Sequence, residues 1–201
     1  MEIRVSKVHY PENPFDLFNE WFHEAASEET NDPNAMSLAT VSASGVPSVR
    51  MVLLKGLTDE QFVFYTNLNS RKAKEIQQNP NIGLCFYWKS LHKQVRIEGV
   101  CEQVSREEAD SYFATRPVGS QIGAWASQQS EPLENRAVLE ESLAKYALEF
   151  GDNPVPRPIH WSGFKVKPTL IEFWQEQPFR LHDRIVYTLT NDSWKHKRLY
   201  P

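Results

Sequence analysis

Residues 82–98 read IGLCFYWKSLHKQVRIE, and this stretch decides the class of fold. Its first part, Ile82 to Trp88, is almost entirely apolar, which is typical of a strand buried on both faces. Its last part, Gln94 to Glu98, alternates strictly between polar and apolar residues, as a strand with one solvated face does. The stretch therefore predicts that the centre of the chain is a β-sheet.

Similar patterns extend the prediction in both directions. Further strands are expected at Ser37 to Val41, Ser48 to Lys55, Phe62 to Asn67, Gly163 to Lys167, Leu170 to Trp174, Arg184 to Leu189 and Trp194 to Leu199. Helical periodicity and capping residues predict helices at Asn13 to Ala26, Ser70 to Asn79, Ser105 to Arg116 and Leu133 to Phe150, the last with an apolar stripe. We therefore expect a β-rich α+β fold, an antiparallel β-barrel with flanking helices.

The chain of 201 residues is expected to form a single domain over residues 1–201. In this division residues 1–33 are an N-terminal arm and helix. Residues 159–201 are C-terminal strands that are too few for a separate core and so complete the barrel.

Composition excludes several classes of protein. The chain is 40% hydrophobic and carries a net charge of −4, so neither disorder nor a basic surface for nucleic acid or an anionic membrane is expected. No apolar run approaches the ~20 residues of a membrane span, and Met1 to Tyr10 lacks the apolar core of a signal peptide, which predicts a cytoplasmic protein. Cys85 and Cys101 are expected to be buried thiols, and no metal site or glycine-rich nucleotide loop is predicted.

Three segments carry positively charged side chains at positions where such charges destabilise the predicted local structure. Arg71 and Lys72 follow the predicted cap Ser70, where the positive end of a helix repels them unless an anion binds there together with Thr66. The alternative is that both side chains extend into solvent.

The second place is the set Tyr112, Arg116 and Ser120, which could converge on one small anion. The alternative is that Tyr112 packs in the core and Arg116 complements a helix end. The third place is a strand with Arg50 and Lys55 on either side of a middle, Met51 to Leu54, that should be buried, so that buried cations there would need a partner. The alternative is that both side chains reach solvent at the ends of the strand.

Near the C-terminus, Arg180, His182 and Arg184 are predicted to share one face of a strand, with Asp183 on the other. Three such residues repel one another unless something polar or anionic lies against them, although a solvated edge strand is the ordinary alternative. No arrangement of nucleophile and base can be argued from spacing.

In combination, these segments resemble the FMN-dependent pyridoxamine (pyridoxine) 5′-phosphate oxidases from about Asn34 to Pro201. The motifs that carry the resemblance are Arg50 to Lys55, Phe64 to Asn67, Ser70 to Lys72, Phe86 to Trp88, Gln94 to Gly99, Tyr112 with Phe113, Arg116 with Pro117, Ser120 to Trp125, Gln129 with Ser130, Glu172 to Gln175, Arg180 to Arg184 and Arg198 to Pro201.

The resemblance implies an FMN-binding split barrel and a homodimer with FMN at the subunit interface. The implied FMN site is Arg50, Met51, Val52, Leu53, Leu54, Lys55, Tyr65, Thr66, Arg71, Lys72, Gln94, Gln129, Ser130, Trp174 and Arg184, with Arg71 and Lys72 at its phosphate. The implied substrate site is Lys55, Tyr112, Arg116 and Ser120 at the 5′-phosphate, together with Arg180, Leu181 and His182.

The implied reaction is the oxidation of pyridoxine 5′-phosphate or pyridoxamine 5′-phosphate by O₂ to pyridoxal 5′-phosphate and H₂O₂, a step of vitamin B6 salvage. Arg180 and His182 would orient and polarise the substrate, while Asp183 would fix one of these side chains rather than act as a base. The N-terminus departs from the family, because Arg4 and Tyr10 lack the spacing expected of an arm that closes over the substrate.

Two other functions are possible alternatives to a phosphate oxidase. A related flavin oxidase of phenazine biosynthesis would have no use for Lys55 and the rest of a phosphate clamp. A non-catalytic protein that binds flavin or pyridoxal phosphate would have little need for Arg180 and His182.

Overall fold

The computed structural model describes residues 10–201. Residues 1–9 lie outside the described part of the chain. The prediction that no signal peptide is present and the departure at Arg4 both fall on them.

Within residues 10–201 the chain forms five α-helices, nine strands and one short 3₁₀ helix. In chain order these are α1 (Pro14–Glu28), β1 (Ala35–Val41), β2 (Pro47–Leu53), β3 (Gly56–Thr58), β4 (Gln61–Asn67), α2 (Arg71–Gln78), β5 (Asn81–Trp88), β6 (Lys93–Gln103), α3 (Arg106–Ala114), α4 (Val118–Ala126), α5 (Arg136–Phe150), β7 (Trp161–Gln175), η1 (Pro178–Arg180), β8 (Asp183–Thr190) and β9 (Ser193–Leu199).

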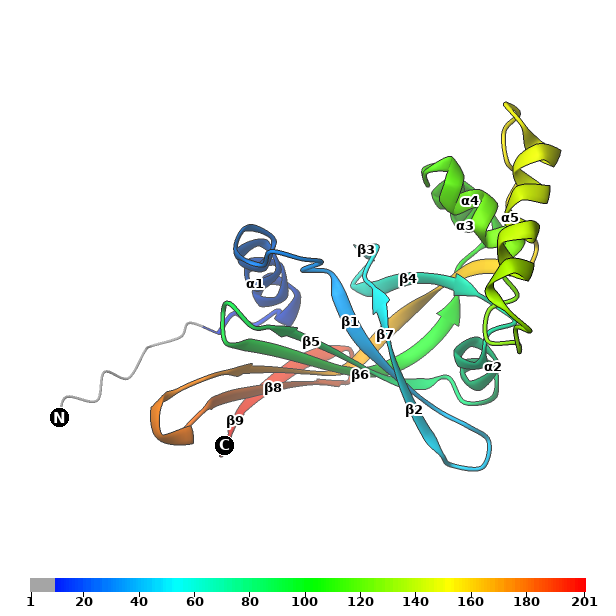
Figure 1. Cartoon of the computed structure of the whole chain (residues 1–201). Coiled ribbons are helices and arrows are strands. Elements are labelled where there is room, and N and C mark those ends of the chain that lie inside the picture. Colours follow the sequence, from blue (N-terminus) through cyan, green and yellow to red (C-terminus); the bar gives the residue numbers. More distant parts are fainter. Residues whose placement is uncertain (1–9) are drawn as a thin grey trace.

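The strands form one curled antiparallel sheet, open on one side, which is the split-barrel form of the predicted fold (Figure 1). Its order is β2-β1-β5-β6-β7-β4-β3, and β8 and β9 continue from β7. Strand β6 alternates between buried and exposed residues, as its sequence predicts. The strands beyond residue 160 belong to the same sheet as the rest of the chain, whereas the division into domains stays a prediction.

The main core lies between α1 and the concave side of the sheet. Phe18 of α1 meets Phe62 edge-on with ring centroids 4.9 Å apart, and Trp21 meets Phe173 at 5.2 Å. Asn13 caps this helix by accepting a hydrogen bond from the Phe15 amide. Burial of such rings contributes roughly 2 kcal/mol each, so these contacts hold α1 against the sheet.

Two strand predictions are wrong. Gly163 to Lys167 and Leu170 to Trp174 are one strand, β7, which passes through Pro168. A register shift between Glu98 and Gly99 accommodates the proline, which cannot donate a hydrogen bond to the ladder.

The middle of β2 is also not buried as predicted, because β2 is an edge strand of the sheet. Met51 is 61% exposed and Val49 is 67% exposed. An apolar edge strand of this kind is a typical surface for contact with another chain.

The helical region after β6 differs from its prediction in three ways. Helix α3 ends at Ala114 rather than at Arg116, and α4, with Pro117 at its cap, was not predicted. The apolar stripe predicted for α5 is only partly covered, since no residue of this helix is fully buried. Helix α5 packs on α4 through Tyr146 and Phe150, whose rings lie against Trp125.

Candidate functional site

A cleft of about 690 Å³ lies where β2, β4 and α2 meet α3 and α4. Eleven of the site residues predicted from the sequence line it: Met51, Val52, Leu53, Lys55, Tyr65, Thr66, Lys72, Tyr112, Arg116, Ser120 and Gln129. The fold thus brings two predicted anion sites, more than 40 positions apart in the sequence, into one cavity.

Lys72 lies in the cleft with neutral partners. Its ammonium donates to Gln129 Oε1 at 2.8 Å and to Thr66 Oγ1 at 3.2 Å, and it lies 3.3 Å from Ser70 Oγ. Burial, with a smaller contribution from Arg50, lowers the pKa of Lys72 to about 8. No carboxylate in residues 10–201 forms an ion pair with this ammonium. A bound anion would therefore stabilise its charged form.

Ser70 occupies the cap position of α2, as predicted, but its side chain does not cap the helix. The hydroxyl donates instead to the Asn67 carbonyl at 2.6 Å. The prediction that this hydroxyl caps the helix is therefore wrong, because its oxygen points to the preceding turn and accepts no hydrogen bond from a first-turn amide. The first-turn amides of α2 stay free of a side-chain acceptor from the cap.

Arg71 lies outside the cleft. Its Nε donates to Glu75 Oε1 at 2.8 Å, and its side chain is 63% exposed. The buried Glu75 also lies 3.4 Å from Arg50, whose Nη1 donates to Leu38 O and Thr40 Oγ1. Glu75 therefore orients both arginines, one on each side of its carboxylate.

Hydrogen bonds keep the Glu75 carboxylate ionised. Burial raises its pKa, but hydrogen bonds from Ser48, Thr40 and Arg71 outweigh burial and lower the pKa to about 2. Sequence reasoning missed Glu75, although its place four residues after Arg71 on one helix is a signal for an ion pair.

Arg116 lies at the other side of the cleft against aromatic rings. Its guanidinium carbon is 4.7 Å from the Trp161 ring centroid and 5.6 Å from that of Phe113. Its Nη1 is buried, and within the described residues it has no hydrogen-bond partner. Burial lowers the pKa of Arg116. A buried donor without a partner is costly, so this guanidinium is suited to an anionic ligand.

The backbone that carries Arg116 and Ser120 is held by Gln121. This buried amide donates to the carbonyls of Phe113 and Arg116, each at 3.0 Å, and so joins the end of α3 to the start of α4. The sequence did not reveal this role. Tyr112 stacks on Tyr65 with ring centroids 3.9 Å apart.

A second group of predicted residues lies on β6, β7 and β8 and in the turn that leads into β8. We call Gln94, Trp174, Arg180, His182 and Arg184 the β8 cluster. Gln94, Trp174 and Arg184 are register partners across the three strands, and the His182 ring lies 4.7 Å from the Trp174 ring.

Glu172 holds Arg184 in the β8 cluster. Arg184 Nε donates to Glu172 Oε1 at 2.8 Å, and Arg96 Nη2 donates to Oε2 at 2.7 Å. Burial raises the pKa of Glu172, but the two arginine hydrogen bonds outweigh burial and lower it. Glu172 belongs to one of the motifs that carry the family resemblance, but sequence reasoning did not identify it as the residue that orients Arg184.

The predicted common strand face of Arg180, His182 and Arg184 is wrong. Strand β8 begins at Asp183, and residues 178–180 form a 3₁₀ turn in which Phe179 and Arg180 have φ of 60° and 62°. Two successive left-handed residues turn the chain, so strand alternation cannot extend to Arg180.

Asp183 also differs from expectation. It accepts hydrogen bonds from Tyr10 and Arg198, whereas His182 Nδ1 lies 3.3 Å from the Gln177 amide. Asp183 therefore fastens β8 to β9 and to the segment before α1, and it contacts neither Arg180 nor His182 by a hydrogen bond within the described residues.

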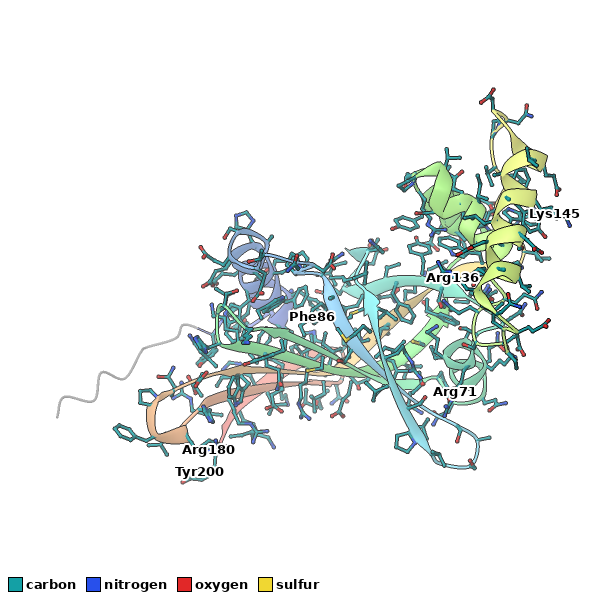
Figure 2. The ribbon with its side chains drawn as sticks, in the orientation of Figure 1. Arg71, Phe86, Arg136, Lys145, Arg180 and Tyr200 are labelled. Atoms are coloured by element: carbon teal, nitrogen blue, oxygen red, sulfur yellow. The ribbon has the colours of Figure 1, made fainter. Side chains whose placement is uncertain are left out.

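One chain does not bring the cleft and the β8 cluster together. No member of the β8 cluster lines the cleft, nor do Arg50, Leu54, Arg71, Ser130 or Leu181. Figure 2 shows Arg71, at the α2 end, and Arg180 on opposite sides of the molecule.

The remaining predictions concern cysteines, metals and membranes. Both thiols are free; Cys101 is buried and Cys85 is half-buried. Within residues 10–201 no cluster of His, Cys, Asp and Glu is arranged to hold a metal ion. No helix of the described chain is long and apolar enough to cross a membrane. The cytoplasmic location stays a prediction.

Two family models match the chain. Residues 22–148 match the model of pyridoxamine 5′-phosphate oxidase, and residues 161–201 match that of the pyridoxine 5′-phosphate oxidase C-terminal dimerisation region. Together the two matches include the residues that line the cleft and those of the β8 cluster.

Similar proteins agree with these models. The pyridoxine/pyridoxamine 5′-phosphate oxidase of Rhodospirillum rubrum is 55% identical over 194 residues, covering 94% of this chain and 96% of the relative. That of Bartonella quintana is 53% identical over 193 residues, covering 94% and 93%.

Two solved structures share the fold. PhzG from Burkholderia lata, in complex with tetrahydrophenazine-1-carboxylic acid, superposes with a TM-score of 0.90 at 28% identity, covering 97% of this chain and 98% of that one. An FMN-binding, pyridoxamine 5′-phosphate oxidase-related protein from Nostoc punctiforme superposes with a TM-score of 0.77 at 18% identity, covering 96% and 100%.

Proposed function

The chain belongs to the pyridoxamine 5′-phosphate oxidase family, and from this membership we propose that it oxidises pyridoxine 5′-phosphate and pyridoxamine 5′-phosphate to pyridoxal 5′-phosphate. The alcohol and O₂ give the aldehyde and H₂O₂. The amine also consumes one water and releases ammonia. The observation that carries the proposal is the cleft itself, in which two separate cations, Lys72 and Arg116, lack carboxylate partners among the described residues.

Two cationic positions fit two phosphate groups, one on a cofactor and one on a substrate. The family is one of flavoproteins, and we propose FMN as the flavin because its single phosphate suits the Lys72 position. When bound, the flavin ring supplies the acceptor for the hydride equivalent that leaves C4′ of the substrate. An FMN phosphate would restore the charge that burial disfavours on Lys72.

The chain's own residues would bind and orient the cofactor and the substrate. In the proposal Lys72, Thr66 and Gln129 would hold the FMN phosphate, and Met51, Val52 and Leu53, which line the cleft, would contact the cofactor. Lys55, Tyr112, Arg116 and Ser120 hold the substrate phosphate, which fixes the distance from the anchored end to C4′. Anchoring of this kind converts binding energy into the alignment of the reacting carbon.

The β8 cluster is proposed to act across a homodimer interface. Arg180 and His182 would orient the pyridine ring, while Gln94, Trp174 and Arg184 would contact the flavin. Since these residues lie away from the cleft of their own chain, we propose that they complete the cleft of a second copy. The match of residues 161–201 to a dimerisation region supports this arrangement, as does the exposed apolar edge of β2.

The chief competing function is that of a phenazine-type flavin oxidase, since the PhzG structure has nearly the same fold. The ligand in that structure is a carboxylic acid. A substrate without a phosphate ester would leave the Arg116 side of the cleft without its dianion. The closer relatives, at 53–55% identity, also carry the name of the phosphate oxidase.

The test is an aerobic assay of the FMN-loaded protein with each phosphorylated substrate. We expect pyridoxal 5′-phosphate and H₂O₂ to form in equal amounts. Bound FMN without turnover of either substrate would contradict the proposal, and would favour the phenazine-type or non-catalytic alternative.

A further inference from the structure

Trp161 is the aromatic residue that most closely faces the Arg116 guanidinium, and the sequence did not place it in the site. It is the first residue of β7, it is 7% exposed, and it lines the cleft. Its ring is nearly parallel to that of Tyr65, with centroids 5.3 Å apart and an angle of 5° between the planes.

Several contacts hold the Trp161 backbone and ring in one position. Its carbonyl accepts a hydrogen bond from Arg157 Nη1 at 2.6 Å, and its amide donates to the Pro158 carbonyl at 2.9 Å. Arg157 is in turn paired with Asp110 of α3, with 2.6 Å between Nε and Oδ1. The ring edge meets Phe113 at a centroid distance of 5.0 Å. Trp161 is therefore tied to the same helix that ends just before Arg116.

Gly163 allows the neighbouring ring to take its place. A Cβ atom at Gly163 would lie 2.7 Å from Cδ1 and 2.8 Å from Cε1 of Tyr65. The missing side chain gives the Tyr65 ring room to lie parallel to both Tyr112 and Trp161. The three rings are parallel within 7°, and they form one continuous aromatic wall beside the guanidinium.

We propose, as an extension of the proposed function, that Trp161 is a positioning residue for the substrate's phosphate monoester and acts through Arg116. Its ring attracts the cation by a cation–π interaction and removes water from one face of the guanidinium. Nη1 is left buried without a partner in the described residues, so the phosphate supplies its missing acceptor. Trp161 thus favours a phosphorylated ligand over its unphosphorylated analogue.

The test compares Trp161→Leu with the wild-type holoenzyme. We expect KM for pyridoxine 5′-phosphate to rise about ten-fold while kcat changes less than about two-fold, because the ring supports binding of the phosphate and not the step at C4′. Binding of pyridoxal 5′-phosphate, measured by equilibrium dialysis, should weaken by about the same factor. Binding of unphosphorylated pyridoxal should not change.

Trp161 also belongs to a small core cluster, so a control must separate packing from positioning. Val155→Ala removes volume from the same cluster at a residue that does not line the cleft. This variant should lower the melting temperature and leave KM unchanged. Trp161→Phe keeps an aromatic face and should raise KM only about three-fold, which gives a second variant if Trp161→Leu does not fold.

A double-mutant cycle with Arg116→Ala decides whether Trp161 acts through the guanidinium. We expect either Trp161 substitution to add less than about two-fold to KM once Arg116 is absent. Full additivity, or an unchanged KM in Trp161→Leu, would overturn the inference. Wild-type protein that turns over neither substrate would instead contradict the proposed function, so the two failures can be told apart.

Discussion

Helix α2 and strand β7 each use a buried glutamate to orient two arginines, but the groups left free around them differ. At the α2 end the buried Glu75 holds Arg50 and Arg71; on β7 the buried Glu172 holds Arg96 and Arg184. The α2 end adds the cleft, where Lys72 has only neutral partners and Arg116 has an unpartnered nitrogen among the described residues.

In the β8 cluster Arg184 is paired with Glu172, and the cluster adds the exposed Arg180 and the rings of Trp174 and His182. The difference indicates that the two regions contact different parts of the ligands. The cleft is equipped to bind phosphates, whereas the β8 cluster is equipped to contact rings.

The largest expected effect comes from removing either bridging carboxylate. Glu75→Ala leaves Arg50 partly buried without its ion-pair partner, and Glu172→Ala does the same to Arg184. We expect each to lower the free energy of unfolding by about 3 kcal/mol, measured by urea denaturation. A loss below about 1 kcal/mol at one end would show that the two carboxylates are not equivalent.

The pH dependence of stability sharpens this prediction. The pKa of Glu75 is lowered from 4.5 to about 2 in the folded chain, so its contribution is complete above about pH 4.5 and is lost as the pH falls toward 2. Glu75→Gln should remove that part of the pH dependence. An identical acid-unfolding profile would contradict the assigned pKa.

The next effect concerns the substrate phosphate. Arg116→Ala should raise KM for pyridoxine 5′-phosphate by 10- to 100-fold, since a charge-assisted hydrogen bond contributes about 1.5–3 kcal/mol. Steady-state kinetics measures it, with Arg136→Ala on α5 as a control, because Arg136 pairs with Glu140 on the surface and does not line the cleft. An unchanged KM would remove Arg116 from the site.

A smaller effect is expected for FMN binding as a function of pH. Because the pKa of Lys72 is about 8 in the free chain, raising the pH through 8 removes the charge that the FMN phosphate needs. We expect the dissociation constant of FMN to rise about ten-fold between pH 7 and pH 9 in fluorescence titrations. Lys72→Arg should flatten this dependence, and a slope that persists in that variant would point to another group.

The smallest effect tests how the β8 cluster is fastened. Tyr10→Phe removes the hydroxyl that donates to Asp183 but keeps the ring beside Arg198. We expect a loss of about 1 kcal/mol in the free energy of unfolding and no change in FMN affinity. A larger change in FMN affinity than in stability would give Asp183 a direct role that the structure does not support.

Local patterns predicted the strands β5 and β6 because apolar runs and alternation act over a few residues, but β5 is not buried on both faces, since Tyr87 is 56% exposed. The capping box at Ser105 likewise set the start of α3. Sequence reasoning failed where a distant contact decides the outcome. The register shift opposite Pro168 keeps β7 continuous, and α4 forms because Gln121 joins it to the end of α3.

The candidate site shows the same limit. A helix start with two cations pointed to Lys72, yet it could not show that Arg71 turns to Glu75 instead of the cleft. Strand alternation misplaced Arg180 because Phe179 and Arg180 adopt left-handed conformations that no local pattern signals. Trp161 was missed because its contact with Arg116 spans 45 positions of the sequence.

The central claim is that the cleft of one chain works with the β8 cluster of a second copy, and subunit complementation tests it most directly. One variant carries Lys72→Ala and Arg116→Ala, and the other carries Arg180→Ala and His182→Ala. Each alone should be nearly inactive at low substrate. Co-expression with random pairing should restore about a quarter of wild-type activity, because half of the dimers would hold one intact site. No recovery in dimers shown to be mixed would mean that each site is built within a single chain, and would contradict the account.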